Sequence, residues 1–126
     1  MKLFLDDMRC PSECALYMHR RIGKDNPIYL EGEWFIVRNY DQFCKALIAF
    51  CPYITHVSFD HDLADEHYAP EEHWDTDWHE HQEFKEKTGY DCAVFLKEFY
   101  DNRNYPIMYV HSMNPVGTQR IINLFK

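Results

Sequence analysis

The chain has 126 residues and a mass of 15.3 kDa, which suits a single domain, residues 1–126, whose core is stable without disulfide bonds. Lys and Arg number 13 against 21 Asp and Glu, and the net charge of −8 argues against binding to long duplex nucleic acid, which requires a basic surface. No apolar stretch is long enough to cross a bilayer, so we expect a cytoplasmic protein without a membrane partner.

The first half of the chain alternates short apolar segments with amphipathic ones. Buried strands are expected at residues 3–5, 34–37 and 54–59, with a weaker candidate at residues 28–30. Pro11 begins a helix that we expect to end near Gly23, and Asp41 begins a second helix that Pro52 ends. This order predicts strands joined by helical crossovers.

The second half resumes the alternation after an interruption. Residues 64–87 are acidic and rich in histidine, and we interpret them as an insertion after the third strand. Thr88 and Asp91 then have the spacing of a helix capping box, residues 107–110 predict a fourth strand, and Asn114 begins a last helix. Such a chain predicts a three-layer α/β fold of the receiver or flavodoxin type, with a parallel sheet of strand order 2-1-3-4.

Ionisable residues follow the first and third strands directly, as Asp6 and Asp7 and then as Asp60, His61 and Asp62. In the order 2-1-3-4 these strands are neighbours, and a crevice opens between their carboxyl ends. Neighbouring carboxylates repel one another unless a cation lies between them. Oxygen ligands favour Mg²⁺, Mn²⁺ or Ca²⁺, so the pattern predicts a divalent cation site, whereas simple loop capping is the structural alternative.

Further polar residues lie near the same edge of the expected sheet. Arg9 and Arg38 follow strand ends, where a guanidinium can hold a phosphate through two hydrogen bonds, although both also fit as ordinary surface residues. Thr88 and Asn114 are interpreted first as helix caps, and the helices that they begin also offer N–H groups to an anion. These residues are candidates for phosphate binding.

The insertion offers two weaker hypotheses. Its histidines are expected to be solvated, with a second metal site as the alternative. Trp74 and Trp78 are one helical turn apart and suggest either a packed lid or a surface that stacks on a base. The histidines concerned are His67, His73, His79 and His81.

Five segments together resemble a known family. LFLDDMRCP, WFIVRNYDQF, VSFDHDL, TGYDCAVFL and VHSMNPVG occur in this order and resemble the cyclic-phosphate-processing receiver-like domain, which is related to the receiver domains of two-component signalling. Only residues 64–87 lie outside the resemblance. It implies a receiver-like fold and metal-assisted hydrolysis of a cyclic phosphate on a nucleotide, an RNA end or ADP-ribose.

The resemblance also implies roles for individual residues. Asp6, Asp7 and Asp60 would hold Mg²⁺ or Mn²⁺ against the phosphodiester. His61 and His111 would act as base and acid, in an order that the sequence leaves open.

The remaining roles concern orientation and the phosphate. Asp62 would orient a histidine, and Arg9 and Ser112 would contact the phosphate. Two alternatives stay open: a protein that binds a cyclic nucleotide without cleaving it, and a degenerate phospho-accepting receiver domain. The receiver alternative is weaker, because too few residues follow His111 for a fifth strand and the lysine that receivers carry after it.

Overall fold

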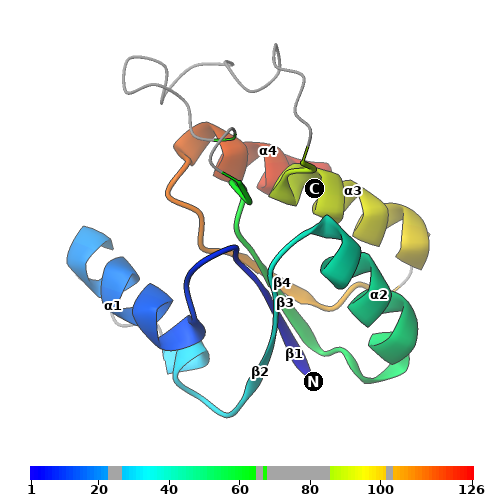
Figure 1. The fold of residues 1–126 in the computed structure, drawn as a ribbon, viewed down its shortest axis with the longest axis horizontal. Coiled ribbons are helices and arrows are strands. Elements are labelled where there is room, and N and C mark those ends of the chain that lie inside the picture. Colours follow the sequence, from blue (N-terminus) through cyan, green and yellow to red (C-terminus); the bar gives the residue numbers. More distant parts are fainter. Residues whose placement is uncertain (23–26, 65–66, 68–85, 102–103) are drawn as a thin grey trace.

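A four-stranded parallel sheet with the order β2-β1-β3-β4 forms the centre of the protein (Figure 1). The computed structural model describes residues 1–22, 27–64, 67, 86–101 and 104–126. The strands are β1 (Lys2–Leu5), β2 (Trp34–Val37), β3 (His56–Phe59) and β4 (Ile107–Val110). The helices are α1 (Pro11–Ile22), α2 (Tyr40–Phe50), α3 (Gly89–Tyr100) and α4 (Pro115–Leu124), with short 3₁₀ helices η1 (Pro27–Tyr29) and η2 (Cys51–Tyr53).

Helices cover both faces of the sheet, which makes three layers. Helix α1 lies on one face, and α2, α3 and α4 pack on the other (Figure 1). The larger core includes Phe43 of α2, Leu96 of α3 and Ile121 of α4, all buried with Val57 and Phe59 of the sheet. The receiver-like fold and the strand order expected from the sequence are therefore confirmed.

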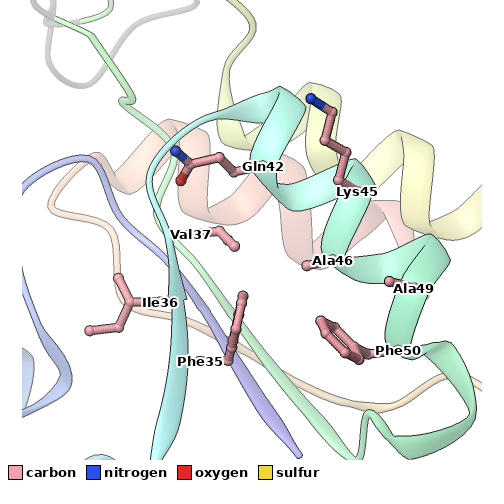
Figure 2. A pocket seen from close by; sticks show the side chains of 8 residues that line it. All are labelled: Phe35, Ile36, Val37, Gln42, Lys45, Ala46, Ala49 and Phe50. Atoms are coloured by element: carbon pink, nitrogen blue, oxygen red, sulfur yellow. The ribbon is translucent and has the colours of Figure 1, made fainter.

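The side chains of β2 alternate between the two faces, as the period of a strand requires. Phe35 and Val37 point toward α2, whereas Ile36 points away from it (Figure 2). Between β2 and α2 lies a groove of about 350 Å³, lined mainly by apolar side chains with Gln42 and Lys45. Among the described residues that line this groove, Lys45 is the one with an ionisable side chain.

Two sequence-based boundaries differ from the structure. Residues 28–30 do not form a strand, because the carbonyl oxygen of Pro27 accepts hydrogen bonds from the N–H groups of Leu30 and Glu31 and closes η1. Strand β3 begins at His56 and not at residue 54, since the N–H of Ile54 is used to cap η2.

The ends of the insertion are tied together by a histidine. The ring of His67 is fully buried, and its Nδ1 accepts a hydrogen bond from the Leu63 N–H at 2.8 Å. Its Nε2 then carries the proton and donates to the Glu86 carbonyl oxygen at 2.7 Å. The expectation of a solvated side chain is thus wrong for His67. The other histidines of the insertion, Trp74 and Trp78 lie outside the described residues.

None of the helices in the described ranges has the length and apolar character needed to cross a membrane.

Candidate functional site

The parallel hydrogen-bond ladder continues past the ends of three strands. The N–H groups of Asp6, Asp60 and His111 donate to the carbonyl oxygens of Val37, Leu5 and Phe59, at 3.1, 2.9 and 2.9 Å. The loops after β1, β3 and β4 therefore leave the same edge of the sheet with their backbones still paired. Their first side chains converge there, as the topology predicts.

A small acidic pocket lies at this edge. Carboxylate oxygens of Asp6, Asp7 and Asp60 all lie within 4.8 Å of one another. They belong to a pocket of about 170 Å³, whose other lining residues are Met8, Arg9, Asp62 and Met113. The structure thus brings together the three carboxylates that the sequence suggested as cation ligands.

Asp6 is the most strongly hydrogen-bonded of these carboxylates. Its Oδ1 accepts the backbone N–H groups of Met8 at 2.9 Å and Arg9 at 2.8 Å, and its Oδ2 accepts Arg9 Nε at 2.9 Å and His111 Nε2 at 3.1 Å. Burial alone would raise the pKa of Asp6, but these hydrogen bonds lower it to about 2. Asp6 is therefore ionised, and it can bind a cation directly only where one donor, such as Arg9 Nε, gives way.

The pKa values of Asp7 and Asp60 are shifted in the opposite direction from that of Asp6. Burial and the charge of Asp6 raise the pKa of Asp7, and the same causes raise the pKa of Asp60 well above its usual value. Asp60 Oδ1 accepts the His61 N–H at 2.9 Å and lies 3.6 Å from Arg9 Nη2. Its Oδ2 accepts no hydrogen bond from a described residue. The pocket therefore holds more carboxylate charge than the nearby donors neutralise, and oxygen donors at this spacing fit Mg²⁺ or Mn²⁺.

The two arginines suggested by the sequence have different surroundings. Arg9 lines the pocket, and its Nη1 is buried without a hydrogen-bond partner among the described residues. Arg38 lies behind the loop, where its Nη1 donates to the carbonyl oxygens of Asp6 at 3.1 Å and Arg9 at 2.7 Å. Arg38 thus braces the backbone that carries the acidic residues, whereas Arg9 lines the pocket.

Both histidines of the site lie behind carboxylates. His61 Nδ1 is 2.8 Å from Asp62 Oδ1, and His111 Nε2 is 3.1 Å from Asp6 Oδ2. Both rings are fully buried, while Asp6 and Asp62 line the pocket. Burial lowers the pKa of His111 although the hydrogen bond to Asp6 opposes this effect. The roles of base and acid expected for these rings require contact with the reacting groups, whereas each ring is hydrogen-bonded to a carboxylate that lines the pocket in its place.

The three remaining phosphate candidates act as caps. Thr88 forms a reciprocal capping box with Asp91 at the start of α3. Asn114 caps α4 by accepting the Gly117 N–H at 2.8 Å, and Ser112 Oγ accepts the Asn114 N–H at 3.0 Å. None of Thr88, Ser112 and Asn114 lines the pocket formed by the described residues. Their polar atoms hold the ends of the two helices that pack on the site.

Two glycines that the sequence analysis did not single out bring these helices close to the site. A Cβ at Gly89 would lie 1.7 Å from the Asp60 carbonyl oxygen, and the Gly89 N–H donates to the His61 carbonyl oxygen at 2.7 Å. A Cβ at Gly117 would lie 2.5 Å from His61 Cγ. The glycines in TGYD and NPVG were the available signal, since each stands at the start of a helix, where a glycine has no propensity advantage.

Comparison with protein families identifies the family of this chain. A family model described as "Cyclic-phosphate processing Receiver domain" matches residues 1–126 of the chain. No curated protein and no solved structure matches it significantly.

Proposed function

The chain belongs to the cyclic-phosphate processing receiver domain family, and from this premise we propose that it is a metal-dependent phosphoesterase that hydrolyses a cyclic phosphate. Its substrate would be a nucleotide, an RNA end or an ADP-ribose derivative. The observation that carries the proposal is the cluster of Asp6, Asp7 and Asp60 within 4.8 Å, with Arg9 beside it at the carboxyl edge of the sheet.

A divalent cation, Mg²⁺ or Mn²⁺, would be held mainly by Asp7 and Asp60, with Asp6 as the third carboxylate. When bound, the cation would neutralise charge on the phosphoryl oxygens and make a nearby water more acidic. Two features support this assignment. Burial and then the Asp6 charge raise the pKa of Asp60 although Arg9 Nη2 lies 3.6 Å from its Oδ1, so Arg9 only partly offsets them, and Asp60 Oδ2 accepts no hydrogen bond from a described residue.

Arg9 would bind the phosphate. Its Nε is held by Asp6 at 2.9 Å, which fixes the plane of the guanidinium. Its Nη1 has no acceptor among the described residues, and a buried donor without an acceptor is costly. A phosphate oxygen would satisfy this donor once the side chain turns it toward the pocket, and a guanidinium suits phosphate because it presents parallel N–H groups.

Asp62 is the candidate base. It lines the pocket, and its Oδ1 is held by His61 Nδ1 at 2.8 Å. In the proposed reaction a water attacks phosphorus, its proton passes to Asp62, and the bond from phosphorus to one ring oxygen breaks. That oxygen leaves as a hydroxyl after it takes this proton from Asp62, so the product is a phosphomonoester. His61 would orient Asp62 from behind and would share the charge that develops on it.

The decisive experiment combines metals, substrates and one variant. The protein is incubated with Mn²⁺ or Mg²⁺ and with a 2′,3′-cyclic mononucleotide, an RNA oligonucleotide ending in a 2′,3′-cyclic phosphate, or a cyclic phosphate of ADP-ribose. We expect a phosphomonoester from at least one substrate, no product in EDTA, and none from Asp60→Asn. Recovery of intact ligand that nevertheless binds would identify a sequestering protein and would overturn the proposed hydrolysis.

A further inference from the structure

A chain of buried polar groups runs from the α1 face of the sheet to the pocket. Tyr29 Oη lies 2.8 Å from Ser58 Oγ, Ser58 Oγ lies 2.6 Å from His111 Nδ1, and His111 Nε2 lies 3.1 Å from Asp6 Oδ2. We call these four residues the buried relay. Their exposed fractions are 3%, 0%, 0% and 1%, so the side chains of Tyr29, Ser58 and His111 have no access to a substrate, and Asp6 is the member of the relay that lines the pocket.

The hydrogen bonds of the relay have a single consistent direction. Asp6 is ionised and only accepts, so His111 Nε2 must carry a proton and donate to it. The His111 ring is fully buried, which favours the neutral imidazole; this form has only one N–H, so Nδ1 accepts from the Ser58 hydroxyl at 2.6 Å. The Ser58 oxygen is then the acceptor for the Tyr29 hydroxyl.

The opposite direction would be unfavourable. If His111 carried its proton on Nδ1, the lone pair of Nε2 would face the Asp6 carboxylate at 3.1 Å. Asp6 would lose a charge-assisted hydrogen bond, which is stronger than a bond between neutral groups. The ring cannot easily turn to escape this contact, since it stacks on Phe4 with a centroid distance of 4.3 Å and an interplanar angle of 6°.

We propose that Tyr29 and Ser58 are positioning residues, which hold His111 as the tautomer protonated on Nε2 so that it fixes the orientation of the Asp6 carboxylate at the pocket. The inference rests on the proposed function in one respect, since its expected effect on metal affinity assumes that Asp6 takes part in binding the cation. The His111 tautomer protonated on Nε2 should be present already in the protein without metal or substrate. Outer groups that orient metal ligands typically change affinity by about 10- to 100-fold.

The first measurement is NMR of the ring nitrogens in ¹⁵N-labelled, metal-free protein near neutral pH. We expect His111 to show a protonated Nε2 and an unprotonated, hydrogen-bonded Nδ1. In Ser58→Ala the Nδ1 resonance should move to the position of a nitrogen without a donor, and Tyr29→Phe should move it less in the same direction. Tyr109→Phe is the matched control, since Tyr109 packs on Tyr29 with ring centroids 6.4 Å apart but lies outside the relay.

The second measurement is the affinity for Mn²⁺, determined by calorimetry on the folded variants. Ser58→Ala should bind Mn²⁺ about 10-fold more weakly, Tyr29→Phe should show a smaller loss, and Tyr109→Phe should match the wild type. The double variant that combines Ser58→Ala and Tyr29→Phe should lose less Mn²⁺ binding free energy than the sum of the two single losses, because both residues act through one chain of hydrogen bonds.

The outcomes separate the two proposals. A His111 ring protonated on Nδ1 in the wild type, or equal Nδ1 resonances in the wild type, Ser58→Ala and Tyr29→Phe, would overturn the relay whatever the protein hydrolyses. The expected resonances together with no Mn²⁺ binding by the wild type would support the tautomer and overturn the metal-dependent function. Unchanged Mn²⁺ affinity in Ser58→Ala would refute the positioning role.

Discussion

Replacement of Gly89 by alanine should destabilise the protein and displace the loop that carries Asp60. Helix propensity alone predicts the reverse, since alanine in place of glycine stabilises a helix by about 0.5 to 1 kcal/mol. At this position, however, the new Cβ would lie 1.7 Å from the Asp60 carbonyl oxygen, 2.7 Å from its carbonyl carbon and 2.8 Å from His61 Cα. All three atoms belong to the backbone, so no side chain can rotate away.

The size of the effect follows from the overlap. Contacts between heavy atoms are normally about 3.5 Å, so the start of α3 and the loop after β3 would have to separate by roughly 1.5 Å or more. That movement would break the 2.7 Å hydrogen bond from the Gly89 N–H to the His61 carbonyl oxygen. Overpacking typically costs about 1 to 3 kcal/mol, the loss of this hydrogen bond adds about 1 kcal/mol, and the helix propensity of alanine offsets about 0.5 to 1 kcal/mol, so we expect a net loss of about 1 to 3 kcal/mol.

Urea denaturation measures this loss as a lower transition midpoint at constant slope. Glu98→Ala, an exposed position on the same helix, should stay within about 0.5 kcal/mol of the wild type. Because Asp60 moves with the loop, the remaining folded Gly89→Ala protein should also bind Mn²⁺ more weakly. A Gly89→Ala variant as stable as the wild type would refute the argument that this glycine is required by close packing.

Three further predictions concern the charges of the pocket. Asp60→Asn should abolish Mn²⁺-dependent turnover. Without metal at pH 7 it should raise the free energy of unfolding, because burial and the Asp6 charge raise the pKa of Asp60 and so make its ionised form costly in the folded protein. The wild type loses stability as pH rises through that pKa, so urea titrations should show no advantage of the variant below pH 3.8, the usual pKa of this carboxyl. Asp6→Asn should cost on the order of 2 kcal/mol above about pH 4, and this cost should fall as pH drops toward 2, since the pKa of Asp6 is lowered to about 2. Calorimetry should show that a 2′,3′-cyclic nucleotide binds at least about 10-fold more weakly in EDTA than in Mn²⁺, and equal affinities would exclude a shared site for cation and phosphate.

The position of the site could be predicted from the sequence because topology determines it. Four apolar segments separated by helices specify a parallel sheet, and the order 2-1-3-4 makes the strands that end at Asp6 and Asp60 neighbours. The helix caps could also be predicted, since Thr88, Asp91 and Asn114 act within three residues of their partners. Local spacing and strand order are both visible in a single sequence.

The hydrogen-bond partners within the site could not be predicted in the same way. The period of a strand tells which face Ser58 lies on, but not that its hydroxyl meets Tyr29 from η1 and His111 from the loop after β4. Those distances depend on packing across three segments far apart in the sequence. The burial of His61 likewise depends on the close approach of α4 at Gly117. A polar residue inside an apolar strand, as in VSF, was the available signal.

The charge balance of the pocket implies an order of binding. Four aspartates line it, and Arg9 is the only basic residue among the described residues that do so. A cyclic phosphodiester carries one negative charge, and two like charges 4 Å apart repel by about 4 kcal/mol at an effective dielectric constant of 20. Burial and then Asp6 raise the pKa of Asp60, which means that the pocket without a cation disfavours a further negative charge. A divalent cation held by these carboxylates would reverse the local field, so the cation should bind before the phosphate.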